Sequence, residues 1–490
     1  MSGQAPLTQS SPLDRQGEWL SRYRFVPRSA ERGRILSTGD GILWIRGLPG
    51  AEIDELIRCE DGSRAVVFQV ASGNVGAILL EASDALSSGQ SVERLTSPLE
   101  IGVGDELLGR VIDPLGRPLD GDPPPVCPIR NLIDSPSPPI IARDFVARPL
   151  LTGLRIIDTL IPVGMGQREL LIGDSGLGKT SVALDTVINQ KGRGVKCVYV
   201  LIGQKRSTVM NTIQMLRDNE ALGHVVVVVA EATALPGVRY IAPFSGCAIA
   251  EYWMRKGMDA LVVYDDLTAH ANSYRELSLL LRRPPGREAF PADIFSLHAR
   301  LLERSTCLSP SFGGGSLTAL PIIETREGEI ASYLPTNLIS ITDGQIYFDG
   351  ALFSSGFLPA IDLRRSVSRV GGRAQPGAVR EEAGRMKLDY LQFLELLVFT
   401  RFGAKLESSV QKKIDRGRIL REILIQDRFS PFSPTDQMTW LVAYNRGFFD
   451  GLEIPSVKAA LMGLVREGRE SGLTLASPRE DWDRLLGRTR

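Results

Sequence analysis

The chain has 490 residues, of which 43% are hydrophobic and 23% charged, so we expect a soluble globular protein of two or three domains. Lys and Arg together number 57, and Asp and Glu also number 57, which gives a formal net charge of +0. This balance argues against a protein built mainly to coat nucleic acid or an anionic membrane.

Cysteine spacing and apolar runs exclude two further classes. The five cysteines lie far apart and form no C-x-x-C pair, which favours buried thiols in a reducing cytosolic compartment over disulfides or a zinc site (Cys59, Cys127, Cys197, Cys247 and Cys307). No apolar run approaches the roughly 18 residues that a spanning helix needs. Residues 1–34 lack the features of a secretory signal and make a poor transit peptide. We therefore expect other subunits to hold the chain at any membrane.

The pattern of apolar residues divides the first part of the chain. Residues 1–24 are rich in Ser, Gln and Pro and predict a tail with one short helix near Trp19. Residues 25–95 contain short apolar runs broken by glycine, such as residues 42–45 and 65–68, which predict a small β-barrel domain.

The remaining sequence predicts two more domains. In residues 96–372, Pro-rich linkers precede continuous apolar runs that alternate with helical stretches, which is typical of a mainly parallel sheet covered by helices. The predicted strands are residues 169–172, 195–202, 225–230, 260–264, 317–322 and 338–341. In residues 373–490 apolar residues recur at helical spacing. The predicted fold is therefore multidomain α/β, with an N-terminal β-barrel, a central RecA-like P-loop domain and a helical C-terminal domain.

One motif points to nucleotide binding. Eight successive residues fit G-x-x-x-x-G-K-[ST], between a predicted strand and a predicted helix: Gly173, Asp174, Ser175, Gly176, Leu177, Gly178, Lys179 and Thr180. Glycines let backbone N–H groups converge on phosphates at a helix N-terminus, whose dipole favours negative charge. Lys179 can reach the outer phosphates, and the Thr180 hydroxyl can ligate Mg²⁺. The motif predicts ATP or ADP with Mg²⁺ as ligands.

A P-loop needs an acidic anchor for the metal at the end of a neighbouring strand. Residues 260–264 form an apolar run that leads directly into Asp265. We therefore expect Asp265 to share the metal site with Thr180.

Four further stretches resemble the rotary ATPase family, specifically the alpha and beta subunits of F-type ATP synthases: residues 166–170, 280–291, 317–325 and 341–346. The resemblance extends from about residue 33 to about residue 461. It implies a subunit that alternates with its partners in a three-plus-three ring around a central gamma subunit, beneath peripheral stalk subunits. It also implies peripheral attachment to the cytoplasmic face of the bacterial inner membrane through a membrane sector, and no nucleic acid.

Three features resemble alpha rather than beta subunits. Where catalytic beta subunits carry a water-activating glutamate, this chain has Gln204, which cannot accept a proton. Residues 366–372, with Ser366 and Arg369, resemble the alpha motif whose arginine enters the adjacent catalytic site. Residues 402–409 lack the acidic loop of beta subunits. The resemblance thus implies a non-catalytic nucleotide site and an arginine supplied to a neighbour.

The chain departs from the common alpha pattern in places. Residues 175–177 replace an Arg-Gln-Thr sequence, so the loop looks more like that of a beta subunit. Gln426 matches the first of two adenine-contacting glutamines, whereas Arg428 stands at the second. The pattern resembles divergent alpha subunits of the bacterial alternate, sodium-linked enzymes.

An alternative hypothesis is that the chain is a self-sufficient catalytic ring ATPase, either beta-like or a translocase of the Rho type. Such an enzyme needs its own catalytic carboxylate, for which Glu231 and Glu251 are the candidates.

Overall fold

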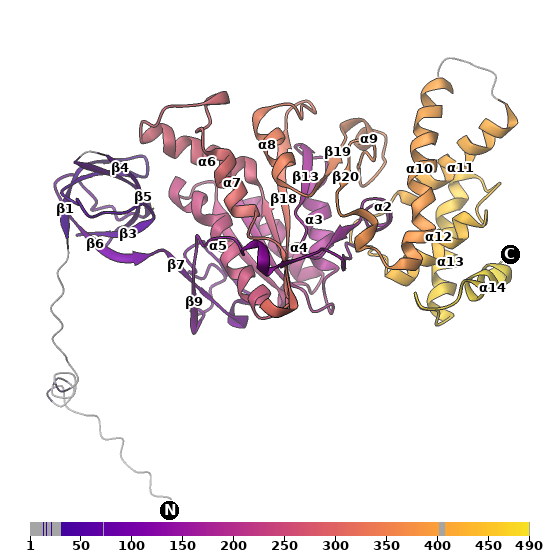
Figure 1. Ribbon diagram of the computed structural model, residues 1–490, viewed down its shortest axis with the longest axis horizontal. Helices are drawn as coiled ribbons and strands as arrows, with labels where there is room; N and C mark the ends of the chain where they lie inside the picture. Colours follow the sequence, from indigo (N-terminus) through magenta and orange to yellow (C-terminus); the bar gives the residue numbers. More distant parts are fainter. Residues whose placement is uncertain are drawn as a thin grey trace, which may run out of the picture.

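The computed structural model describes residues 31–71, 73–400 and 407–489, together with Leu13, Gln16 and Ser21. A β-barrel lies at one end of the molecule, an α/β domain in the middle and a bundle of helices at the other end (Figure 1). This architecture confirms the predicted fold class. The short helix expected near Trp19 and most of the loop at residues 402–409 lie outside the described residues.

Six antiparallel strands close the N-terminal barrel in the order β1-β2-β5-β4-β3-β6. Alternate side chains fill the interior, such as Leu43, Ile45 and Val67, because successive residues of a strand point to opposite faces. Residues that point to the outer face of the barrel, such as Phe68 and Ile78, pack in a core shared with the central domain. The strands are β1 (Arg32–Gly39), β2 (Ile42–Arg46), β3 (Glu55–Cys59), β4 (Arg64–Ala71), β5 (Asn74–Glu81) and β6 (Ser91–Pro98).

The central sheet has the order β20-β19-β13-β18-β16-β14-β15-β8. Neighbours along this order are parallel, except that the edge strand β20 runs antiparallel to β19. The strands are β8 (Val111–Ile112), β13 (Glu169–Asp174), β14 (Lys196–Gln204), β15 (Val225–Glu231), β16 (Asp259–Asp265), β18 (Ser316–Thr325), β19 (Gly344–Phe348) and β20 (Val367–Ser368). Short ladders join β7 (Glu100–Val103) to β9 (Ile129–Leu132), β10 (Arg143–Asp144) to β17 (Cys307–Leu308) and β11 (Pro149–Leu150) to β12 (Val163–Gly164).

Helices cover both faces of this sheet, which explains why its strands are apolar throughout. Val198 and Val200 of β14 belong to one core with α5, whereas Tyr199 and Leu201 belong to the other with α3 and α4. The helices are α2 (Arg155–Leu160), α3 (Lys179–Ile188), α4 (Arg206–Asp218), α5 (Pro236–Arg255), α6 (Leu267–Leu280), α7 (Ile294–Leu302), α8 (Tyr333–Ile341) and α9 (Gly350–Ser354). Six 3₁₀ turns accompany them in the described chain: η1 (Asp105–Leu107), η2 (Ile140–Ala142), η3 (Leu222–His224), η4 (Arg287–Ala289), η5 (Pro310–Phe312) and η6 (Gly371–Ala374).

One predicted strand is wrong. Residues 338–341 form the last turn of helix α8, and the strand follows three residues later as β19. A four-residue apolar run fits one face of a buried helix as well as a strand, and Pro335 in the first turn is compatible with a helix start.

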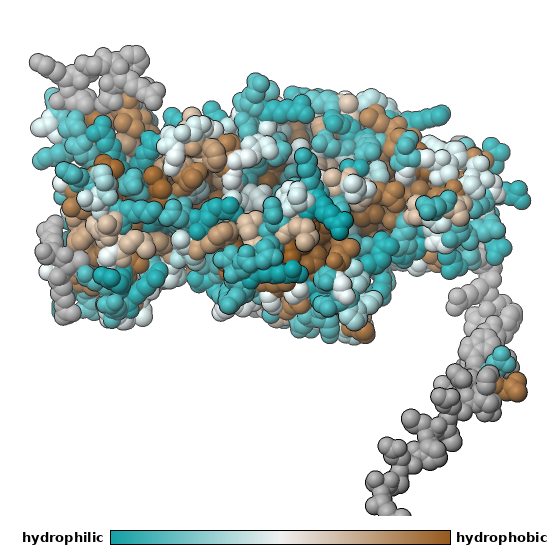
Figure 2. Space-filling view, turned by 180° about the vertical axis from the view of Figure 1, so that it is seen from behind, coloured by the Kyte–Doolittle hydropathy of each residue, from teal (hydrophilic) through white to brown (hydrophobic). Residues whose placement is uncertain are grey.

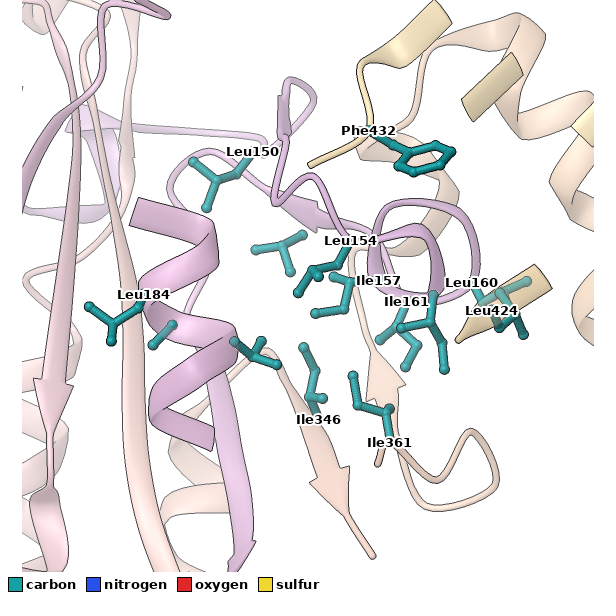
Figure 3. Close-up of a cluster of buried hydrophobic side chains, with 14 of the residues drawn as sticks. Leu150, Leu154, Ile157, Leu160, Ile161, Leu184, Ile346, Ile361, Leu424 and Phe432 are labelled. Atoms are coloured by element: carbon teal, nitrogen blue, oxygen red, sulfur yellow. The ribbon is translucent and has the colours of Figure 1, made fainter. Parts of the chain in front are cut away.

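The C-terminal domain consists of helices α10 (Gly377–Thr400), α11 (Ser408–Leu424), α12 (Pro434–Asn445), α13 (Ile454–Glu470) and α14 (Arg479–Thr489). Its core is continuous with that of the central domain. Figure 3 shows Leu184 of α3 and Ile346 of β19 in the same apolar cluster as Leu424 and Phe432 from the C-terminal part. Burial of this cluster fixes the helical domain against the nucleotide-binding domain.

Apolar and hydrophilic residues are interspersed on the surface shown in Figure 2. Seen from behind, apolar side chains form patches over the central domain, separated by hydrophilic ones (Figure 2). In the part of the chain that the structure describes, no helix has the length and hydropathy required to span a bilayer.

Candidate nucleotide site and arginine loop

The predicted phosphate loop connects β13 to α3, as the motif requires. Gly176 and Gly178 adopt φ angles of 81° and 96°, a left-handed backbone region that favours glycine. A Cβ added at either position would have no heavy atom within 4 Å, so the concave side of the loop is open. The loop thus presents its backbone at a helix N-terminus, where anions are favoured.

Lys179 is the first residue of α3, directly after the loop, and is buried. Its Nζ donates hydrogen bonds to the carbonyl oxygens of Gly173 and Asp174, at 2.8 and 2.6 Å. Burial lowers the pKa of this ammonium, while Glu324, Asp266, Asp265 and Asp174 act in the opposite direction. A buried cation whose hydrogen-bond partners are neutral carbonyls is suited to anionic phosphate oxygens.

Asp265 ends β16 at the same edge of the sheet, and it is 3% exposed. One carboxylate oxygen accepts a hydrogen bond from the Tyr199 hydroxyl at 3.0 Å, and the other lies 3.4 Å from Gln204 Nε2. Burial raises the pKa of Asp265, and hydrogen bonds from Tyr199 and Thr180 oppose this shift. A carboxylate beside the Thr180 hydroxyl is a donor set that Mg²⁺ accepts, so these residues fit the expected metal.

Two acidic residues near Lys179 were not predicted. Asp266 caps α6, where its carboxylate accepts a hydrogen bond from Ala269 N at 2.6 Å, and burial raises its pKa to about 7. Glu324 lies near the end of β18, next to β16 in the sheet, and is exposed. Glu324 follows an apolar run, which is the same signal that indicated Asp265, so it could have been found.

In the phosphate loop, the side chains of Asp174 and Leu177 contact other parts of the protein. The Asp174 carboxylate accepts hydrogen bonds from Thr325 Oγ1 at 2.6 Å and Gly328 N at 2.9 Å. Leu177 is largely buried in the core beside α3, whereas Ser175 is exposed. The Asp174 and Leu177 side chains are therefore engaged by the protein itself, and the Ser175 side chain is accessible.

The segment expected to contact adenine follows α11 and lies against the P-loop helix. The buried Gln426 amide accepts a hydrogen bond from Arg155 N and donates to the carbonyls of Gly153 and Ser430. Phe429 N donates to the Asp185 carboxylate of α3 at 3.0 Å. Arg428 is exposed, with its guanidinium 4.9 Å from the Phe429 ring centroid. The Gln426 side chain therefore stabilises the backbone of this segment. Arg428 is the more accessible of the two residues predicted to contact adenine.

Residues 366–372, here called the arginine loop, lie at the edge of the sheet opposite to the P-loop. Because β20 runs antiparallel to β19, Ser368 pairs with Gly344, and Arg369 N donates to the carbonyl of Asp343 at 2.8 Å. Gly344 is level with Glu169 at the start of β13, four residues before Gly173. At 3.3 Å per residue, about 13 Å of strand separates the arginine loop from the chain's own P-loop.

Backbone and side-chain contacts hold this loop. Arg168 forms a bidentate ion pair with Asp343, which fixes the residue that receives Arg369 N. Ser366 is buried, and its hydroxyl donates to the Asp362 carbonyl and accepts from Tyr347 N. The Arg369 side chain is exposed, and among the described residues no carboxylate forms an ion pair with it.

The two carboxylates considered for self-sufficient catalysis differ in position. Glu251 is 1% exposed and forms a bidentate ion pair with Arg304, with nitrogen–oxygen distances of 2.7 and 3.0 Å. Glu231 ends β15 at the P-loop edge, where its backbone pairs with Gln204. Glu251 is thus committed to the core.

Comparison with known families decides the relationship. The model described as "ATP synthase alpha/beta family, nucleotide-binding domain" matches residues 153–368, and "ATP synthase alpha/beta chain, C terminal domain" matches residues 375–474. The chain belongs to the ATP synthase alpha/beta family.

Several similar proteins within this family are alpha subunits. ATP synthase subunit alpha 1 of Legionella pneumophila (strain Paris) is 62% identical over 475 residues, which cover 97% of each chain. Subunit alpha 1 of Hahella chejuensis is 54% identical over 99% of this chain and 98% of the relative. Subunit alpha 2 of Polaromonas naphthalenivorans is 51% identical over 94% and 89%. The prediction of an alpha subunit of ATP synthase is confirmed.

Proposed function

We propose that this alpha subunit is the regulatory, non-catalytic nucleotide-binding subunit of the catalytic head, and that it supplies Arg369 to the active site of an adjacent beta subunit. The observation that carries the proposal is the position of Arg369 at the sheet edge opposite the chain's own P-loop. An exposed guanidinium there cannot serve its own phosphates, whereas a neighbour in a ring can approach it.

The subunit's own site is proposed to hold Mg-ATP or Mg-ADP. The backbone of residues 173–178 and the Lys179 ammonium would neutralise the phosphates, while Thr180 and Asp265 would hold Mg²⁺. The metal supplies charge neutralisation at the phosphates. Arg428 and Phe429 are proposed to receive the base, which is supported by the hydrogen bond from Phe429 N to Asp185 of α3.

This site is proposed to bind without rapid hydrolysis. Gln204 lies near Asp265, at the position where a catalytic subunit needs a base, and its amide cannot accept the proton of an attacking water. Glu251 cannot take over this role, because Arg304 occupies both of its carboxylate oxygens. The site is thus suited to a structural and regulatory nucleotide.

In the neighbour's site, Arg369 would stabilise the charge that develops on the transferring phosphoryl group. An arginine supplied in trans is worth roughly 10³ to 10⁵ in rate, or about 4 to 7 kcal/mol of barrier. Its planar fork can contact two phosphate oxygens at once, which lysine cannot do. The absence of a competing carboxylate among the described residues leaves this fork available.

The surroundings of the loop support a partner at this edge. Arg168 and Arg143 both form ion pairs with Glu303, which connects the loop to the segment that carries Ile141 and Phe145. These two apolar side chains are 76% and 83% exposed. Exposed apolar groups on a segment that ion pairs link to this loop are expected where another subunit packs.

The proposed assembly alternates three such subunits with three beta subunits around the gamma subunit, with peripheral stalk subunits attached. Membrane sector subunits hold it at the cytoplasmic face of the bacterial inner membrane, where proton or sodium flow drives ATP synthesis or is driven by hydrolysis. The departures at residues 175–177 and at Arg428 support the proposal of a divergent, alternate enzyme of the sodium-linked type.

The test uses the reconstituted head. Arg369→Ala is expected to lower steady-state ATP hydrolysis by about 10³-fold or more, and Arg369→Lys to recover only part of it, while bound nucleotide is retained. Arg373→Ala, at a second exposed arginine four residues away, is the matched control and should keep near-normal turnover. Near-normal turnover of Arg369→Ala would refute the proposal. Appreciable hydrolysis by the purified chain alone would favour the self-sufficient ATPase, with Glu231 as its base.

A further inference from the structure

Glu169 is a buried carboxyl group without an obvious structural task. It is the first residue of β13 and is 0% exposed. One oxygen accepts a hydrogen bond from Gln167 Nε2 at 2.6 Å, whereas the other has no hydrogen-bond partner among the described residues. Burying a carboxyl group in this way costs free energy, which its surroundings must offset.

Gln167 connects Glu169 to the arginine loop. Its Nε2 also lies 3.1 Å from Ser368 Oγ. That hydroxyl donates to the Pro162 carbonyl at 2.8 Å and accepts a hydrogen bond from Gly371 N at 3.1 Å. One serine therefore ties the backbone on both sides of Arg369 to the Gln167–Glu169 pair.

Close packing leaves this arrangement little freedom. A Cβ added at Gly344, which pairs with Ser368, would collide with both carboxyl oxygens of Glu169 and with the carbonyl of Val367. Only a glycine allows β19 to pass between the carboxyl group and the loop. The Glu169 carboxyl group and the Val367 carbonyl of β20 therefore both lie against Gly344.

Charges from three elements act on Glu169. Burial raises its pKa well above the ordinary value, and Asp343 acts in the same direction. Gln167, Lys387 and Arg369 oppose this shift. Lys387 belongs to α10, the first helix of the C-terminal domain, and is half-buried. The carboxyl group therefore lies between the arginine loop and the helical domain.

We propose that Glu169 is a positioning residue that acts through Gln167 and Ser368 to hold Arg369 in the position required by the neighbouring active site. The inference rests on the proposed role of Arg369. Glu169 itself touches no nucleotide and acts only through the loop.

A double-mutant cycle in the reconstituted head tests this. Glu169→Gln keeps the shape but places an amide with its own N–H donors against Gln167, which disturbs the hydrogen bond that links Glu169 to the loop. We expect it to lower kcat by about 10-fold or more with KM within twofold, because small displacements of a transition-state group are costly. In an Arg369→Ala background, single-turnover hydrolysis should show no further loss from Glu169→Gln, since the two residues act in series.

The control is Glu382→Gln. Glu382 is also a buried carboxylate, 4% exposed on α10, and it accepts a hydrogen bond from Asn445 at 2.6 Å, away from the loop. We expect it to lower the unfolding midpoint and leave kcat unchanged. Equal losses from Glu169→Gln in both backgrounds would mean a general structural role and overturn the inference. Normal kcat for Glu169→Gln, with collapse of Arg369→Ala, would overturn this inference alone, whereas normal turnover of Arg369→Ala would remove the proposed function as well.

Discussion

Two buried histidines make the stability of the subunit sensitive to acid. His270 of α6 and His298 of α7 are both 0% exposed, and their rings meet at 3.2 Å between His270 Nδ1 and His298 Nε2. His270 Nε2 lies 3.0 Å from the Tyr240 carbonyl, so it carries the proton and Nδ1 accepts one from His298. Burial lowers the pKa of His270 to about 4, and that of His298 also falls.

The sign and size of the effect follow from these values. Between pH 6.5 and pH 4 the unfolded chain binds a proton at His270 and the folded chain does not, so stability falls as the pH falls. From pH 7.5 to pH 5, His270 alone should lower the free energy of unfolding by about 2 kcal/mol. His298 acts in the same direction.

The perturbation is His270→Gln, whose amide can donate to the Tyr240 carbonyl but cannot become charged. Urea unfolding of the chain at pH 7.5 and pH 5 should show an acid-induced loss that is smaller than the wild-type loss by about 2 kcal/mol. His224→Gln, at a partly exposed histidine, is the control and should change the loss less. An equal acid-induced loss in His270→Gln and wild type would refute this reasoning.

Two further substitutions test the packing of the core. Glu251→Gln should lower the free energy of unfolding by about 3 to 5 kcal/mol, because it leaves the Arg304 guanidinium buried without its partner charge. Equal urea midpoints for variant and wild type would contradict this. Gly417→Ala should destabilise by about 1 to 3 kcal/mol, since its Cβ would overlap the Phe393 ring between α10 and α11. Thermal unfolding measures this change. An unchanged midpoint would contradict the prediction, because it would show that α10 and α11 accommodate the added methyl group without cost.

The sequence predicted those features whose signal is local. The P-loop strand and helix follow from eight successive residues, and Asp265 follows from the apolar run before it. Helix α8 was missed because four apolar residues carry no distinguishing period. Glu324 was within reach by the same reasoning that gave Asp265.

Other features depend on contacts between distant parts of the chain. Gln167 meets Ser368 from 201 positions away, and Gln426 meets Arg155 across 271 positions. No spacing rule connects such residues, so the surroundings of Arg369 and the structural engagement of Gln426 could be found only in three dimensions. The ion pair between Glu251 and Arg304 likewise joins residues that are distant in the sequence, so it could not be predicted either.

The closed β-barrel at the N-terminal end has a consequence for assembly. Since every strand of β1–β6 is hydrogen-bonded on both sides, the ring of strands offers no template for adding another chain's strand. Copies of this barrel that meet in an oligomer therefore contact one another through side chains and loops rather than by strand pairing. Such contacts can slide and re-form without exchanging main-chain hydrogen bonds.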